Sequence, residues 1–133
     1  MNLSLLHTPD GVRDFYGKEL DNKNQIMGKF EETIKLYGYD EIQTPTLEFL
    51  NVFAEDEDYL YQTKTCRFID RDGETLVLRP DYTPSVARCA VKYFSDENVP
   101  LRFFYKGNAF SNKGIYEGKA IEILVDNMYP TRI

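Results

Sequence analysis

Four polar residues lie close together in the stretch LVLRPDYTPSVARC, residues 76–89: Arg79, Asp81, Thr83 and Arg88. Arg79 and Asp81 are two residues apart, so they would lie on one face if a strand continued through both. The Asp81 carboxylate could accept the ammonium group of an amino acid, and a helix beginning near Thr83 would favour an anion. The structural alternative is that Arg79 pairs with Asp81 or the acidic run at 55–58, and that Thr83 only caps its helix. On the residue types alone, this alternative is favoured.

A second group of polar residues lies in RFFYKGNAFSNKGIYEGK, residues 102–119, which alternates basic and aromatic side chains. Cations beside aromatic rings could hold a nucleotide through its phosphates and its base. No glycine-rich loop of the GxxxxGK[ST] type is present, so an ordinary amphipathic hairpin is favoured. Arg102, Tyr105 and Lys106 remain candidate contacts for a pocket or a partner.

The other reactive residue types have no pattern that predicts catalysis or metal binding. The single histidine, His7, has no second histidine and no serine or cysteine motif beside it. Cys66 and Cys89 lack the near neighbour of a CxxC motif and are expected to be reduced thiols. The acids at 55–58 lack the glycine-containing pattern of a calcium loop. We therefore predict no catalytic residue, metal or cofactor.

The composition predicts one cytoplasmic domain spanning residues 1–133. At 133 residues and 42% hydrophobic residues, the chain can bury a core of its own. Its 16 Lys and Arg against 22 Asp and Glu give a net charge of −6, which argues against binding to nucleic acid or an anionic membrane. No apolar stretch approaches the roughly 20 residues needed to span a bilayer. The N-terminus does not have the composition of a signal peptide.

Local patterns place these residues on helices and strands. Apolar residues three or four apart from Glu19 to Tyr37 predict an amphipathic helix, with Gly38 as its C-cap. Residues 40–53 begin extended before Pro45 and then offer a second apolar face. The run at 55–65 is expected to be a solvated loop.

The second half of the chain adds a hairpin, a helix and two strands. Residues 66–80 alternate around Asp72-Gly73, which predicts a hairpin. A helix is expected from Pro84 to Ser95 with Thr83 as its N-cap. Its inward residues should be Val86, Ala87, Ala90, Val91 and Phe94. Strands are expected at 99–110 and 117–126, giving an α+β fold with an antiparallel sheet flanked by helices.

Four segments in series resemble the class II histidyl-tRNA synthetase-like family. They are TPDGVRDFYGKEL, LYGYDEIQTPTLEFL, FIDRDGETLVLRPDYTPSVAR and PLRFFYKGNAF. The resemblance covers roughly residues 5–119 and implies the N-terminal part of a class II synthetase-like catalytic domain. It also implies that the first helix and residues 43–53 form a homodimer contact.

Within this family, two branches differ at positions that this chain contains. Synthetases of this type usually have Glu and then Gly after Arg-Pro, whereas this chain has Asp81 and Tyr82 and looks more like the regulatory subunits of ATP phosphoribosyltransferase. A synthetase also needs an arginine after the phenylalanine of its second motif, but Phe110 is followed by Ser111. The resemblance thus implies a non-catalytic subunit that supports the first step of histidine biosynthesis beside a catalytic subunit, with histidine as a candidate ligand. A histidyl-tRNA synthetase fragment and a degenerate dimerisation fragment remain the alternatives.

The resemblance also implies which residues would remain from an amino-acid site. Asp81 would accept the ligand ammonium, Thr83 would be its polar neighbour, and Glu122 matches an acidic position of the family's site strand. Val125 and Tyr129 stand where the family has glutamine and glutamate. The expectation is therefore a truncated chain with the remnant of a histidine-type site.

Overall fold

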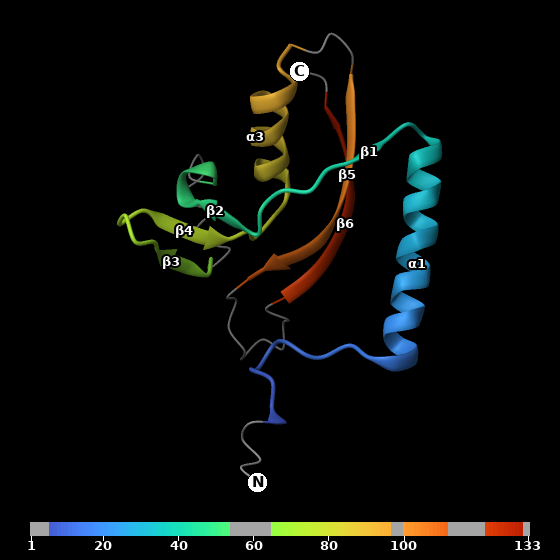
Figure 1. Ribbon diagram of the computed structural model, residues 1–133, viewed down its shortest axis with the longest axis horizontal. Coiled ribbons are helices and arrows are strands. Elements are labelled where there is room, and N and C mark those ends of the chain that lie inside the picture. The colour runs from blue at the N-terminus through green and yellow to red at the C-terminus, as the bar shows by residue number, and fades with distance from the viewer. Residues whose placement is uncertain (1–5, 54–64, 97–99, 112–121, 132–133) are drawn as a thin grey trace.

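The computed structural model describes residues 6–53, 65–96, 100–111 and 122–131, the last of these as backbone. The elements in chain order are α1 (Gly17–Leu36), β1 (Asp40–Glu41), β2 (Leu47–Phe49), the 3₁₀ helix η2 (Leu50–Val52), β3 (Arg67–Ile69), β4 (Thr75–Leu78), α3 (Thr83–Phe94), β5 (Leu101–Phe110) and β6 (Glu122–Thr131). Figure 1 shows a long curved ribbon of β5 and β6, with α3 on one side and α1 on the other. The predicted α+β class is confirmed.

The strands form two separate sheets. The larger has the order β1-β5-β6 and the smaller the order β2-β4-β3. β5 and β6 pair antiparallel from Leu101↔Thr131 to Phe110↔Glu122, and both pairings of the smaller sheet are also antiparallel. β1 instead runs parallel to β5, with Asp40 opposite Phe103. The strand expected at 117–126 corresponds to β6, which is described from Glu122 to Thr131. Residues 112–121 lie outside the described part.

The main core lies between α3 and β5. Its buried members are Tyr82, Val86, Ala90, Phe103 and Tyr105. The helix expected from Pro84 to Ser95 is confirmed to within one residue at each end. The inward orientation predicted for Val91 is wrong, because its side chain is 64% exposed. At 100° per residue, Val91 is rotated about 140° from Val86 around the helix, and the buried residues of α3 are Ser85, Val86 and Ala90.

Helix α1 covers the other side of β5 more loosely. The predicted helix and its glycine end are confirmed, since Gly38 has a φ of 75°. The apolar stripe is mostly not buried: Ile34 is the one buried residue of α1, and Ile26 is 68% exposed. The helix therefore contacts the sheet mainly near its C-terminal half and leaves apolar side chains on its surface.

The smaller sheet is built on the predicted hairpin. The turn is closed by the Asp70 carboxylate, whose Oδ1 accepts hydrogen bonds of 2.9 Å from the backbone N–H groups of Asp72 and Glu74. Gly73 has the positive φ of 87° that this turn requires. A second, small core of Phe53 and Val77 lies beneath this sheet. The loop expected at 55–65 falls almost entirely outside the described residues.

Candidate functional site

The turn that leads from β4 into α3 holds the two central candidates, Asp81 and Thr83. Asp81 Oδ1 accepts hydrogen bonds from the Thr83 backbone N–H at 3.2 Å and from the Thr83 hydroxyl at 3.3 Å. The prediction that Thr83 is the N-cap is wrong, because Thr83 is the first residue of α3 and the N-cap is Tyr82, which makes no side-chain capping bond. The two bonds to Thr83 orient the Asp81 carboxylate at the N-terminal end of α3, where it remains half-buried.

The structural alternative predicted that Arg79 pairs with Asp81 or with the acidic run at 55–58. The pairing with Asp81 is wrong, and residues 55–58 lie outside the described part. The Arg79 Nε donates to the Asn108 carbonyl at 2.9 Å, and its Nη1 donates to the carbonyls of Thr44 at 2.8 Å and Pro45 at 3.1 Å. The side chain is buried, at 6% exposure, and this desolvation lowers its pKa, partly offset by Tyr82 and Glu48. Arg79 is therefore a structural link between residues 44–45 and β5.

The Tyr82 ring is enclosed between Arg79 and Tyr105. The Arg79 Cζ atom lies 3.8 Å from the Tyr82 ring centroid, and the Tyr105 ring stacks on the other face at 4.6 Å and 9°. The Tyr82 hydroxyl donates to the Lys106 carbonyl at 3.2 Å. A Cβ atom on Gly107 would lie 1.9 Å from the Tyr82 hydroxyl oxygen, so only glycine leaves room for this ring. Sequence reasoning missed this cluster, although a glycine inside a strand can signal a close approach.

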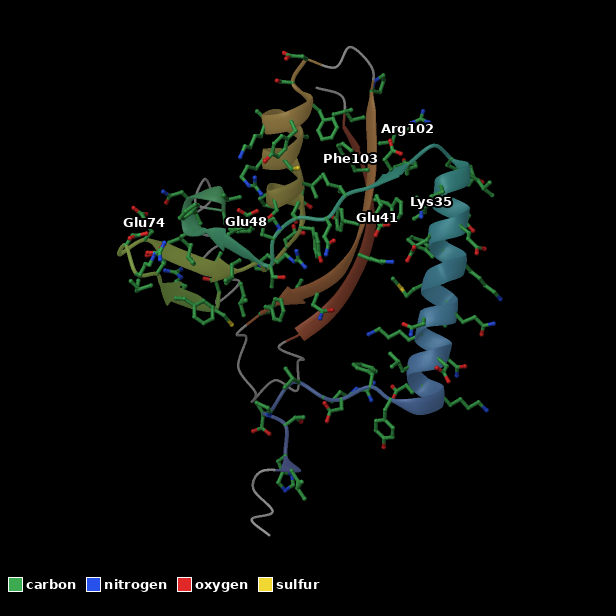
Figure 2. The ribbon with its side chains drawn as sticks, in the orientation of Figure 1. Lys35, Glu41, Glu48, Glu74, Arg102 and Phe103 are labelled. Carbon is green, nitrogen blue, oxygen red and sulfur yellow. The ribbon has the colours of Figure 1, made fainter. Side chains whose placement is uncertain are left out.

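The three candidate contact residues of β5 do not form one group. Tyr105 is buried toward α3, where it supports Tyr82. Arg102 and Lys106 contact the other side: Arg102 Nη1 donates to the Tyr37 carbonyl at 3.2 Å just after α1. Figure 2 shows Arg102 toward α1 and Phe103 toward α3. β5 thus separates Arg102 and Lys106 from the turn that carries Asp81.

Lys106 has acidic partners from two elements on the α1 side. Its Nζ pairs with the Glu31 carboxylate of α1 and lies 3.9 Å from Glu41 Oε1 of β1. A lysine held between two carboxylates is poorly placed to bind a phosphate. This placement argues against a phosphate-binding role for Lys106, while residues 112–119 of the same stretch lie outside the described part.

Arg88, the last polar residue of the opening stretch, joins α3 to the smaller sheet. Its Nη2 and Nε donate to Glu48 Oε1 at 2.6 and 3.2 Å. Glu48 is buried in β2, at 6% exposure, and its hydrogen bond raises the pKa of Arg88. The pair therefore fixes the orientation of α3 relative to β2.

The backbone of β6 places the last candidates in register with β5. Glu122 is opposite Phe110, Val125 is opposite Gly107 and Tyr129 is opposite Phe103. Within the described residues, no group of three or more His, Cys, Asp and Glu residues could hold a metal ion. No helix of the described part is long and apolar enough to cross a membrane.

Comparisons with known proteins agree on one family. A family model described as histidyl-tRNA synthetase matches residues 11–124. A relative from Ruminiclostridium cellulolyticum, named ATP phosphoribosyltransferase regulatory subunit, is 38% identical over 88% of this chain and 28% of its own length. A relative of the same name from Acetivibrio thermocellus is 37% identical over the same shares. The chain thus spans less than a third of the length of these relatives.

Solved structures give the same fold. The ATP phosphoribosyltransferase regulatory subunit/histidyl-tRNA synthetase from Bacillus halodurans is 33% identical with a TM-score of 0.75, over 90% of this chain and 31% of that one. The histidyl-tRNA synthetase from Nostoc sp. PCC 7120 has a TM-score of 0.77 over 92% of this chain and 28% of that one. At 16% identity, this second likeness concerns the fold alone.

Proposed function

The chain belongs to the histidyl-tRNA synthetase family, and from that premise we propose that it is a non-catalytic regulatory subunit of ATP phosphoribosyltransferase. In this role it supports the first step of histidine biosynthesis beside a catalytic subunit that condenses ATP with phosphoribosyl pyrophosphate. The observation that carries the proposal is the name shared by curated relatives that are 33–38% identical over most of the chain.

The end of β5 supports regulation over aminoacylation. Phe110 ends the strand and is followed by Ser111, where a synthetase would be expected to have an arginine. A serine hydroxyl cannot replace the charge-assisted, two-pronged contact of a guanidinium with phosphate or carboxylate. Losing about 3 kcal/mol of transition-state stabilisation would already slow adenylation on the order of 100-fold.

We further propose that the turn at Asp81 and Thr83, with Glu122, is the remnant of a histidine-type amino-acid site. The support is geometric: two hydrogen bonds hold the Asp81 carboxylate at the start of α3. An oriented, half-buried carboxylate is a suitable acceptor for an ammonium group. Tyr105 supports this turn indirectly, because its ring stacks on Tyr82. Arg102 and Lys106 instead make their contacts on the α1 side.

A homodimer contact through α1 and residues 43–53 is part of the same proposal. Both segments carry apolar side chains that are open to solvent, including Leu36 at 86%, Tyr37 at 69% and Phe49 at 52% exposure. Covering such surfaces with a second copy would bury apolar area in an isologous contact. We also propose a cytoplasmic location, consistent with the free thiols of Cys66 and Cys89.

The regulatory and synthetase alternatives are separated by two measurements on the purified chain. We expect the tagged chain to retain the ATP phosphoribosyltransferase catalytic subunit through a wash, and to give no histidine-dependent exchange of pyrophosphate into ATP. Exchange activity without retention would replace the regulatory proposal with the synthetase alternative. If the chain shows neither retention of the catalytic subunit nor exchange, the remaining alternative is the degenerate dimerisation fragment.

A further inference from the structure

The cluster around Tyr82 has the geometry of an occupied binding site. One wall is the Arg79 guanidinium, 3.8 Å from the ring centroid, and the other is the parallel Tyr105 ring at 4.6 Å. At the far end, the Lys106 carbonyl accepts the phenol O–H at 3.2 Å, and Gly107 leaves the space that the hydroxyl fills. The ring is 1% exposed, so all its faces are in contact with the protein.

Both walls of this space are held in place without Tyr82. The Arg79 side chain bonds to the carbonyls of Thr44, Pro45 and Asn108, and its backbone bonds to Thr46 and Phe110. Tyr105 lies in the middle of β5, which pairs with β6 over ten residues and with β1 on its other edge. Because these bonds do not involve Tyr82, the walls should keep their separation when that ring is removed.

We propose that the space between Arg79 and Tyr105 is a binding site for a small planar ring with a hydrogen-bond donor, which the chain fills with its own Tyr82 side chain. The class of ligand follows from the walls. A cation above and an aromatic ring below favour a flat, electron-rich ring, and the Lys106 carbonyl requires a donor at the far end. A phenol meets all three requirements. This inference is independent of the proposed function.

The test removes the ring from the full chain and returns it as a free molecule. Tyr82→Ala leaves a ring-sized cavity, for which phenol is the matched ligand and benzene lacks only the donor. At about ten times its dissociation constant, phenol should raise the folded-to-unfolded ratio roughly 11-fold. The thermal midpoint, followed by circular dichroism, should then rise by about 4–7 °C. Benzene should give a clearly smaller rise.

Two other variants separate a specific site from a general cavity. Phe103→Ala opens a cavity in the same core, where Phe103 has an aromatic neighbour, Phe94, at 5.1 Å. In that variant phenol should have no advantage over benzene. Tyr82→Phe keeps the space filled, and phenol should not shift its midpoint. If Tyr82→Ala is unfolded on its own, refolding upon addition of phenol supports the site.

The proposal is overturned by any of three results. The first is that phenol stabilises Tyr82→Ala no more than benzene does, which would mean that the Lys106 carbonyl does not select for a donor. The second is an equal preference for phenol over benzene in Phe103→Ala, which would mean that any cavity in this core suffices. The third is a Tyr82→Ala chain that stays unfolded at saturating phenol, which would mean that the walls do not persist without the ring.

Discussion

The two sides of β5 are packed by different kinds of interaction. Toward α3, the strand contributes Phe103 and Tyr105 to a buried core, and Arg79 and Tyr82 complete it with directional hydrogen bonds. Toward α1, Phe104 is fully buried beside Lys35, but the other contacts are polar. Arg102 donates to the Tyr37 carbonyl just after α1, and Lys106 lies between two carboxylates, with Lys106 and Glu41 each about 40% exposed. Exposed ion pairs contribute little to stability, whereas buried packing contributes much. The α3 side therefore carries more of the buried packing, and the α1 side carries more of the partly exposed charge.

Paired arginine variants should show the largest contrast between the two sides. Arg79→Met leaves the carbonyls of Thr44, Pro45 and Asn108 without their donor, and should lower the free energy of unfolding by about 3–5 kcal/mol. Arg102→Met removes one exposed hydrogen bond and should cost about 0.5 kcal/mol or less. Urea denaturation of both variants measures the difference. Equal costs would contradict the distinction between the sides.

Gly107 gives the next largest effect, because the space at this position is already filled. In Gly107→Ala the new methyl group would meet the Tyr82 hydroxyl, and the φ of 148° is strained for alanine. We expect a loss of about 2–4 kcal/mol in urea denaturation.

Gly28→Ala is the matched control for Gly107→Ala. Nothing lies within 4 Å of the position of its added Cβ, and it is in the interior of α1. It should leave stability unchanged or raise it by about 0.5–1 kcal/mol. A Gly107→Ala chain as stable as Gly28→Ala would show that Tyr82 is not held against β5 as described.

The buried pair of Glu48 and Arg88 should have an intermediate effect. Glu48→Gln keeps the shape but removes the charge that accepts two hydrogen bonds from Arg88. We expect a loss of about 1.5–3 kcal/mol. Glu31→Gln, at the Lys106 pair whose side chains are 41% and 19% exposed, should cost less than about 1 kcal/mol. Thermal unfolding of the two variants provides the comparison, and a larger loss for Glu31→Gln would reverse our assignment of the sides.

The smallest effect is a dependence on alkaline pH. Burial raises the pKa of Tyr82, so the folded state holds the phenol proton more tightly than the unfolded state. The contribution of the Tyr82 phenol to the free energy of unfolding is therefore complete below the ordinary tyrosine pKa of about 10. It is lost as the pH rises through the higher pKa of the folded state. As the pH rises above about 10, Tyr82→Phe should lose less stability than the parent chain. The free energy of unfolding of both chains is measured by urea denaturation at each pH. The same dependence on pH in both chains would contradict this prediction, since the other nine of the 10 tyrosines are common to both.

Local signals in the sequence predicted the elements better than the contacts between them. Pro84 marks the start of α3 and Asp72-Gly73 marks the hairpin, because each acts through neighbouring residues. The partners of Arg79 lie 29–35 residues away along the chain and leave no local pattern.

The same limit applies to the candidate site. The residue types identify the turn at Asp81 and Thr83, but they misplace the helix start by one residue, because the N-cap is Tyr82 and Thr83 is the first helical residue. The stack of Tyr82 on Tyr105 joins two elements whose relative position only the packing of α3 on β5 determines. Sequence resemblance to a family supplied the candidate ligand.

The regulatory role is tested most directly by the rate of the transferase itself. The catalytic subunit of ATP phosphoribosyltransferase is assayed with ATP and phosphoribosyl pyrophosphate while the concentration of this chain is increased. We predict that the rate rises and saturates as the chain is added, and that heat-denatured chain has no effect. A rate that stays constant over the whole titration would contradict the proposed function.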